Sequence, residues 1–416
     1  MTPIILTMII LRPKEVDRIK QIKKWTIVYG RRKTGKTFII ANFIDYNDYF
    51  FVKRDKTIIL KDDTKITYET FVEILKRDLD EGKIIVIDEF HRLGNDFLDF
   101  LQHTKKQGKV ILISSTLHLS KQFFSSHSPI LGFFAEVPIG LIKLLDCVKA
   151  LQAKKIIDKK QLLETGILLR EPITIEEFDA QEPRATFRKI LISSTNTIPS
   201  LIGEIFTEEE RSISGIYEGI LRAIANGNVV SSKISNYLFS AKLIKKDDPS
   251  LIQQHLNNLI KFGIIKRIRI YNKNRFVYKH VSPLARLFYY ADEKYNISER
   301  KLQINEQEVG RIINELMPKI VEDNIREFLV SKFGLSEAVV EARDYDVDAL
   351  LLKFKKPEIA VEVKWKGKIS KQDLIKAEKN LNKVKAKRKL LFVPDKTKLK
   401  VREKFSFDIV DILDFI

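Results

Sequence analysis

The sequence predicts a multidomain α/β protein, and three observations favour this fold class. The N-terminal third alternates short β-branched runs with helical patterns, as parallel-sheet proteins do. The middle carries helical apolar spacing, and the last quarter returns to apolar runs interrupted by charged residues. At 416 residues the chain exceeds one compact core, so we expect four units, at residues 1–140, 141–206, 207–295 and 296–416.

Composition narrows the class of protein. A hydrophobic fraction of 44% fits a folded chain and is too high for a disordered one. No segment has the length and apolar character of a membrane span, so we expect no membrane partner. The single cysteine, Cys147, excludes an intramolecular disulfide and indicates a cytoplasmic protein.

The net charge of +19 is concentrated near the C-terminus. Between Lys353 and Lys404 there are 19 Lys or Arg against 6 Asp or Glu. A basic segment of this kind favours a polyanion as partner, which we expect to be nucleic acid and specifically DNA. The alternative is an ordinary solvated surface, rich in lysine as in heat-adapted proteins.

The first unit contains a phosphate-binding loop between a predicted strand, Trp25–Tyr29, and a predicted helix, Phe38–Ile44. The loop matches the Walker A motif, and its residues are Gly30, Arg31, Arg32, Lys33, Thr34, Gly35, Lys36 and Thr37. The two glycines allow backbone N–H groups to turn toward phosphate, and the helix offers its positive end. We therefore expect ATP along this loop. Lys36 should reach the β- and γ-phosphates, and Thr37 should hold Mg²⁺.

A second strand, Lys83–Ile87, is continuously apolar and ends in Asp88 and Glu89. Acids at the carboxyl end of a parallel strand face the ligand crevice. We expect Asp88 to bind Mg²⁺ through water and Glu89 to orient or deprotonate the attacking water. A third strand, Lys109–Ile113, is followed by Ser115, which either senses the γ-phosphate or belongs to an ordinary turn.

Histidine metal sites are not expected in this unit. No Cys or His partner stands at metal-binding spacing from His91, His103 or His118. These side chains are therefore predicted to lie at the surface or in capping positions.

Residues 141–206 are predicted to form a small helical lid, with breaks at Pro172, Pro183 and Pro199. After Ser214, three helical patterns precede two alternating segments around the turn Asn272-Lys273-Asn274, which predicts a winged helix-turn-helix. The third helix, Asp248–Phe262, either enters a DNA groove or serves only in packing. The acids at its start favour packing, because they are poor partners for phosphate.

The last unit combines a helix with a hairpin that carries charges. The helix is predicted over Met317–Phe333, with Gly334 ending it. The strands Tyr345–Leu352 and Glu358–Trp365 predict a hairpin centred near Lys356. This centre places Asp348 opposite Lys364, with Glu362 two residues away on the same face.

The chemistry of this hairpin points to phosphodiester hydrolysis. Asp348 and Glu362 would hold a metal ion at the scissile phosphate, and Lys364 would activate water or stabilise charge. The spacing Asp-x(13)-Glu-x-Lys is that of PD-(D/E)XK nucleases. The alternative is an exposed hairpin face with an ion pair, against which stands the cost of placing charges in an apolar strand.

Taken together, these motifs resemble the archaeal STAND-like AAA+ ATPases that carry a C-terminal DUF234-type PD-(D/E)XK nuclease-like domain. The resemblance implies an AAA+-like parallel sheet, a helical lid, a winged helix and a restriction-endonuclease-like α/β domain. It also implies that Glu322, Asp348, Glu362 and Lys364 match the nuclease positions.

The chain departs from this family at two places. Thr197-Ile198-Pro199-Ser200 stands where family members often have a Gly-x-Pro segment. Many members also carry arginines after the sensor strand, whereas Leu131–Phe134 contains none. Arg170 and Arg184 are the candidates for an arginine finger. A homo-oligomer or another protein partner is the alternative source of one.

Two functions follow as hypotheses. In the first, ATP gates nucleic-acid binding or Mg²⁺-dependent cleavage by the C-terminal domain. In the second, the chain is a STAND-type signalling switch that binds nucleic acid without cleaving it.

Overall fold

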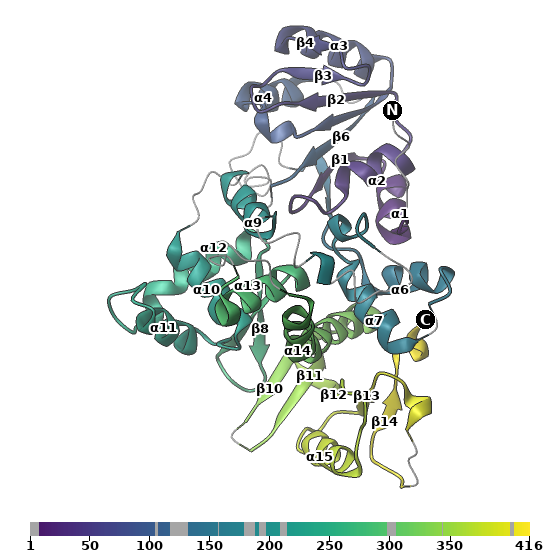
Figure 1. Ribbon diagram of the computed structural model, residues 1–416. Helices are drawn as coiled ribbons and strands as arrows, with labels where there is room; N and C mark the ends of the chain where they lie inside the picture. Colours follow the sequence, from purple (N-terminus) through teal and green to yellow (C-terminus); the bar gives the residue numbers. More distant parts are fainter. Residues whose placement is uncertain are drawn as a thin grey trace.

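The computed structural model describes residues 8–104, 107–116, 132–156, 158–178, 188–190, 197–208, 214–297, 305–342, 344–399 and 403–416. These residues contain two seven-stranded sheets, which lie at opposite ends of an elongated molecule, with the helices of the middle region between them (Figure 1). No helix of the described ranges is long and apolar enough to cross a membrane.

The N-terminal sheet has the strand order β4-β3-β2-β5-β6-β1-β7. Its strands are β1 (Trp25–Tyr29), β2 (Asp48–Val52), β3 (Ile58–Leu60), β4 (Lys65–Ile66), β5 (Ile84–Asp88), β6 (Lys109–Ser114) and β7 (Phe134–Pro138). All neighbours from β2 to β7 in this order are parallel, and β3 and β4 add an antiparallel edge. Because β6 lies between β1 and β5, the residues that follow these three strands meet at one edge of the sheet.

Helices cover both faces of this sheet. They are α1 (Pro13–Gln21), α2 (Lys36–Phe43), α3 (Tyr68–Asp80), the 3-10 helix η1 (Phe90–Arg92) and α4 (Asn95–His103). Ile27 and Ile87 pack with α3 and α4, whereas the adjacent Val28 and Val86 pack with α1 and α2. Burial on both faces explains why the strands are uninterrupted apolar runs, and the three strands predicted around the loop are confirmed.

The middle region is helical, as expected. It contains α6 (Leu144–Ala153), α7 (Lys159–Leu168), η2 (Pro172–Thr174) and α9 (Thr197–Glu208). Pro172 begins η2, since proline is tolerated at the first position of a helix. Pro183 lies outside the described residues.

The next region has the predicted order of three helices and a hairpin. It contains α10 (Gly215–Ala225), α11 (Ser231–Ser240), η3 (Pro249–Ile252), α12 (Gln253–Lys261), β8 (Ile265–Ile270), β9 (Phe276–His280) and α13 (Pro283–Tyr295). Asp248 caps η3 by accepting from Ser250 N, and Asp247 accepts from Ser235 Oγ at 2.6 Å. The acids before the third helix therefore have structural roles.

The C-terminal sheet has the order β14-β13-β12-β11-β10-β8-β9, so it includes the hairpin of the preceding region. Its remaining elements are α14 (Glu306–Phe333), β10 (Ser336–Glu341), β11 (Asp346–Lys353), β12 (Lys356–Val363), α15 (Lys371–Asn382), β13 (Arg388–Phe392), η4 (Lys396–Lys398), β14 (Asp408–Val410) and η5 (Ile412–Phe415). β8 and β10 are parallel neighbours, with Ala338 paired to Arg269 and Val339 to Ile270. One sheet thus crosses the boundary expected at residues 295 and 296.

Two details of the last unit differ from the prediction. The helix ends at Phe333 with Gly334 in the left-handed conformation, as expected, but it begins at Glu306, where Asn305 and Glu308 form a capping box. The hairpin register predicted between Asp348 and Lys364 is wrong. Ala349 pairs with Val361, which brings Asp348 toward Glu362, because the turn is made by Phe354 and Lys355, both with positive φ, and is not centred on Lys356.

One hydrophobic core joins most of the described elements after the first sheet, while α15 packs in a separate cluster on the other face of the C-terminal sheet. It contains Leu151 of α6, Phe206 of α9, Leu256 of α12, Ile325 of α14 and Phe392 of β13. The lid, the three-helix region and one face of the C-terminal sheet therefore pack as a continuous body.

Candidate functional site

The phosphate-binding loop connects β1 to α2 and depends on two glycines. A Cβ on Gly30 would lie 2.0 Å from the carbonyl oxygen of Ile139, so no other residue fits there. Gly35 has φ +83°, a left-handed conformation that glycine adopts without strain. Lys36 Nζ donates to the carbonyl oxygens of Gly30 and Arg31, at 3.0 Å each, which holds the ammonium against the loop.

The residues predicted to hold Mg²⁺ are brought together. Thr37 Oγ1 donates to Asp88 Oδ2 at 2.7 Å, and the hydroxyl of Tyr49 donates to the same oxygen at 2.8 Å. Burial raises the pKa of Asp88, although the bond from Thr37 lowers it. A hydroxyl beside a buried carboxylate is the oxygen donor set that suits Mg²⁺. Tyr49 was not identified from the sequence, because it comes from the neighbouring strand β2.

Glu89 occupies a left-handed backbone conformation, with φ 58°. Its Oε2 accepts from Ser115 Oγ at 2.9 Å, so the structure joins the acid after β5 to the hydroxyl after β6. His91 Nδ1 lies 3.4 Å from the same oxygen and 3.1 Å from Ser114 Oγ. The prediction that His91 is a surface or capping residue is wrong, because η1 turns it back toward Glu89. His103 is exposed as expected, and His118 lies outside the described residues.

The other loop residues face protein groups. Arg31 Nη2 lies 3.1 Å from Glu171 Oε2, and Arg32 Nε lies 3.0 Å from Glu204 Oε2. Lys33 is exposed and has φ 61°.

Thr34 is buried and anchored through its backbone. Its carbonyl oxygen accepts from Arg12 Nη1 at 2.9 Å, and Arg12 Nη2 also donates to Gly140 O at 3.1 Å. Arg12 is a residue that the sequence patterns did not single out. It fixes the loop against the segment that leads into the lid.

The two arginine-finger candidates have different outcomes. Arg170 is buried and donates to Ile142 O, Asn324 Oδ1 and Glu327 Oε1. It therefore holds α14 to the segment after β7. Arg184 lies outside the described residues.

The C-terminal carboxylates come from three elements. Glu322 lies on α14, Asp348 on β11 and Glu362 on β12, and Lys364 follows β12. Glu362 Oε2 accepts from Lys364 Nζ at 2.6 Å and its Oε1 accepts from Asn380 Nδ2 at 3.2 Å. Asp348 Oδ2 accepts from Val363 N at 2.8 Å.

Glu362 is buried, Glu322 and Asp348 are partly buried, and the three carboxylates act on one another electrostatically. Burial raises the pKa of Glu322 to about 7, and the charge of Asp348 adds to the effect. The same two causes raise the pKa of Glu362 to about 7. The pKa of Asp348 is also raised, mainly by burial. The four predicted residues thus form a single electrostatic cluster, to which Lys319 adds a bond to Glu322 Oε2 at 3.1 Å.

The cluster offers few ligands for a metal ion. Within the ranges that the structure describes, no three His, Cys, Asp or Glu side chains lie close enough together to hold one. The ammonium of Lys364 bonds to Glu362, where a cation would otherwise neutralise the carboxylate. One or two carboxylates with substrate phosphate suffice for Mg²⁺, so Asp348 and Glu362 still fit that smaller role.

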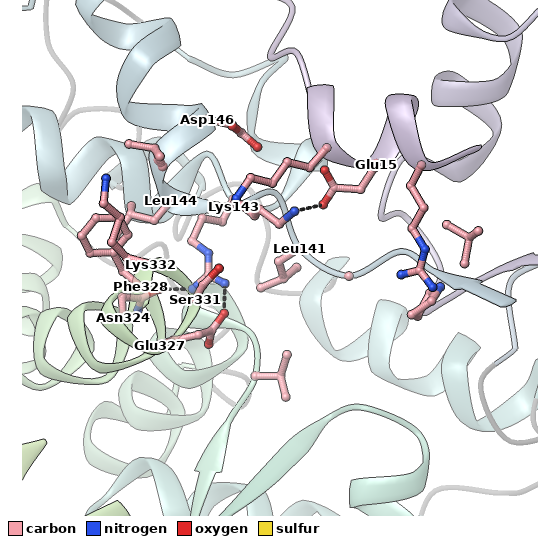
Figure 2. A pocket seen from close by; sticks show the side chains of 18 residues that line it. Glu15, Leu141, Lys143, Leu144, Asp146, Asn324, Glu327, Phe328, Ser331 and Lys332 are labelled. Atoms are coloured by element: carbon pink, nitrogen blue, oxygen red, sulfur yellow. Dashed lines mark hydrogen bonds and ion pairs between the residues drawn. The ribbon is translucent and has the colours of Figure 1, made fainter. Parts of the chain in front are cut away.

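A cavity of about 780 Å³ lies away from both groups of residues. Figure 2 shows Leu141 and Lys143 on one side of it and Asn324, Glu327 and Phe328 of α14 on the other. The cavity separates the segment after β7 from α14. It is thus a gap between the first unit and the last.

One comparison with known proteins finds a family match, and this match lies within the first unit. Residues 22–129 match the family model described as AAA domain. No curated protein matches the chain.

Three solved structures that resemble the chain are of archaeal proteins. The Walker-type ATPase PABY2304 of Pyrococcus abyssi has 19% identity and a TM-score of 0.51, and the match covers 68% of this chain and 96% of that one. The STAND protein PH0952 of Pyrococcus horikoshii has 15% identity and a TM-score of 0.32, covering 78% and 48%. The ORC2 protein of Aeropyrum pernix has 13% identity and a TM-score of 0.41, covering 74% and 96%.

Proposed function

We propose that the chain binds and hydrolyses Mg-ATP and uses the nucleotide state to control nucleic-acid binding by its C-terminal unit. The observation that carries the first part is the meeting of Thr37, Asp88 and Glu89 at one edge of the parallel sheet. Mg²⁺ held by Thr37 and Asp88 would neutralise phosphate charge. ATPase chemistry is then mainly positioning and electrostatic stabilisation, which these residues supply.

Each residue has a task that follows from its geometry. Lys36, which bonds to loop carbonyls, exchanges these bonds for phosphate oxygens, because a charged acceptor makes the stronger hydrogen bond. Glu89 orients the attacking water and takes its proton, and Ser115 holds the carboxylate in place.

The ATPase proposal is tested by binding of a fluorescent ATP analogue and by phosphate release. Lys36→Ala should lose both, while Lys76→Ala, a matched change of an exposed lysine in α3 on the face of the sheet, should lose neither. Equal binding by the parent and Lys36→Ala would contradict the proposal.

Nucleic-acid binding is supported by the surface of the C-terminal sheet and α15. Its exposed lysines include Lys353, Lys355, Lys356, Lys376, Lys379 and Lys383. Binding through these side chains should weaken with salt by a slope of about −0.9 per phosphate contact in a plot of log K against log salt. Lys376→Glu with Lys379→Glu should weaken binding to a DNA duplex, and salt-independent binding would count against the proposal.

A second candidate function is metal-dependent cleavage of the bound nucleic acid. The raised pKa values of Glu322 and Glu362 favour it, because buried carboxylates that repel one another are stabilised by a divalent cation. In this scheme Asp348 and Glu362 hold the cation and Lys364 activates water.

The rival is a STAND-type switch that binds without cutting. Incubating plasmid and single-stranded DNA with Mg²⁺ or Mn²⁺ separates the two. Cleavage that Asp348→Asn abolishes supports a nuclease, since the change keeps the shape and removes the charge. Binding without cleavage in the parent protein supports the switch. In either scheme a second copy of the chain supplies the missing arginine. ATP turnover per molecule that rises with protein concentration would reveal such a copy.

A further inference from the structure

Two adjacent residues that follow α7 connect the phosphate-binding loop with α14. Glu171 reaches the phosphate-binding loop, and Arg170 reaches α14, the helix that carries Glu322. Both side chains are buried, at 6% and 5% exposure. Because little water reaches these two charged groups, their protein partners are what stabilises their charges.

The carboxylate of Glu171 is shared between two structures. Its Oε2 accepts from Arg31 Nη2 at 3.1 Å, while Oε1 accepts from Leu284 N at 3.1 Å and from Ser282 Oγ. Leu284 lies in the first turn of α13, where an acid is favoured by the exposed N–H groups and the helix dipole. Glu171 thus ties the loop to the start of α13.

Phosphate in the loop would compete with Glu171 for Arg31. A polyphosphate offers more charge and more acceptor oxygens than a carboxylate, and arginine binds it bidentately. Glu171 keeps its bonds to α13 when Arg31 leaves it. The competition therefore changes the link between the loop and the lid without leaving Glu171 unpaired.

From this link, two routes lead to the C-terminal cluster. Arg286 of α13 donates to Asp323 of α14, Arg326 donates to the same residue at 2.6 Å, and Arg326 Nη1 donates to Asp348 O at 3.2 Å. This route ends on the backbone of a cluster residue.

The second route is α7 itself. Glu164 Oε1 accepts from Trp365 Nε1 at 2.9 Å in a buried contact, and Trp365 directly follows Lys364. Lys159 at the start of α7 bonds to Asp395 and Asp411, at 2.9 and 2.7 Å. α7 therefore holds the strand ends beside the cluster.

The cavity beside Arg170 gives these contacts freedom to change. Leu141 and Lys143 face Asn324 and Glu327 across it (Figure 2). Because no close packing fills this space, α14 and the first unit can alter their separation without a steric cost.

We infer that Glu171 is a positioning residue that couples phosphate in the loop to the carboxylate cluster through α7 and α13. The inference rests on the proposed ATP binding. Without nucleotide, Glu171 holds Arg31. With nucleotide, Arg31 turns to phosphate, and the released lid shifts Trp365 and Arg326, and with them Lys364 and Asp348.

The two tryptophans of the chain, Trp25 and Trp365, allow a direct test. In a Trp25→Phe background, emission reports the surroundings of Trp365 alone. Saturating Mg²⁺ and a non-hydrolysable ATP analogue should shift this emission, and ADP should shift it less. Glu171→Gln keeps the acceptor for α13 and removes the charge that competes for Arg31. It should bind the analogue about fivefold more tightly, the size expected for one partly exposed ion pair, and it should show little further shift.

Two further variants make the result decisive. Glu204→Gln breaks the ion pair between Arg32 and Glu204, which is the control for the pair between Arg31 and Glu171. This variant should keep the emission shift. Arg31→Ala breaks the same link from the loop side and should lose the shift, which covers the case of a poorly folded Glu171 variant. Unchanged shifts in both Glu171→Gln and Arg31→Ala would overturn the inference and leave ATP binding intact. The proposed function would instead be refuted if the parent did not bind the analogue, or if Lys36→Ala bound it as tightly as the parent.

Discussion

At the scale of single residues, Asp88 and Glu89 are adjacent acids with different environments. Asp88 is 2% exposed and accepts from Thr37 and Tyr49 on one oxygen. Glu89 is turned by its left-handed backbone toward Ser115 and His91. The first is therefore suited to a cation and the second to a water molecule.

This division predicts the behaviour of Glu89→Gln. The amide keeps the bond from Ser115 but cannot take a proton, so phosphate release should fall by about 10² to 10⁴, the range for loss of a general base. Binding of the fluorescent ATP analogue should stay the same. Ser115→Ala removes only the hydrogen bond to the Glu89 carboxylate, so it should lower phosphate release less. A Glu89→Gln protein that hydrolyses ATP at the parent rate would show that another group activates the water.

The carboxylate cluster predicts a dependence of stability on pH. Glu322 and Glu362 have pKa values of about 7 in the fold against a usual 4.5, so the folded chain binds more protons than the unfolded one between these values. Stability should therefore fall as pH rises from about 5 to 7. In the double variant with Glu322→Gln and Glu362→Gln, the free energy of unfolding should fall less over this pH range than in the parent, by about 1 to 3 kcal/mol. Parallel pH curves of thermal unfolding for parent and variant would contradict this.

Several residues of the candidate site are not visible in the sequence. The glycines, Lys36 and Thr37 follow a spaced motif, and a motif is local. Arg12 and Tyr49 contribute through contacts between elements far apart in the chain, and nothing near them in sequence marks the partner. Local patterns therefore predict the loop and miss the residues that hold it.

At the scale of elements, β8 and β9 belong to two structures. The hairpin follows three helices as in the predicted winged helix, yet β8 also pairs with β10. Alternating apolar residues predict the strands, but the pattern does not tell which distant strand will pair with them. The same limit explains the wrong register of β11 and β12, since alternation does not encode that Phe354 and Lys355 form the turn.

The shared strand edge predicts a strong effect of Val339→Pro. β10 is flanked by β8 and β11, and the carbonyl oxygen of Val339 accepts from Tyr271 N at 2.8 Å. Proline in a central strand disturbs pairing and should cost about 3 kcal/mol or more. Thermal unfolding should show this loss, while the exposed Glu341→Pro at the end of β10 should cost less. Equal stability of the two variants would mean that β8 and β10 are not held together in solution.

At the scale of the whole molecule, the hydrophobic cores divide the chain differently from the sequence patterns. The sequence predicts four units because composition and periodicity change at about residues 140, 206 and 295. The structure packs the first sheet with its own helices, whereas one core joins α6 to η5. Changes in local pattern thus mark elements of different kind, and the described elements on either side of such a change can share one hydrophobic core.

This arrangement predicts how the molecule unfolds. The described elements from α6 to η5 are joined by one main core and by one sheet that also carries the cluster of α15, so they should lose structure together, and the first sheet should unfold as a second unit. Calorimetry of the parent should resolve at most two transitions, and the ATP analogue with Mg²⁺ should raise the one that belongs to the first sheet. A chain that ends at residue 295 should lack the later transition, because β8 loses β10 and the core loses α14. A separate transition for residues 207–295 would show that the three-helix region folds alone, and the coupling between loop and cluster would then need a looser link than the contacts of Glu171 and Arg286 provide.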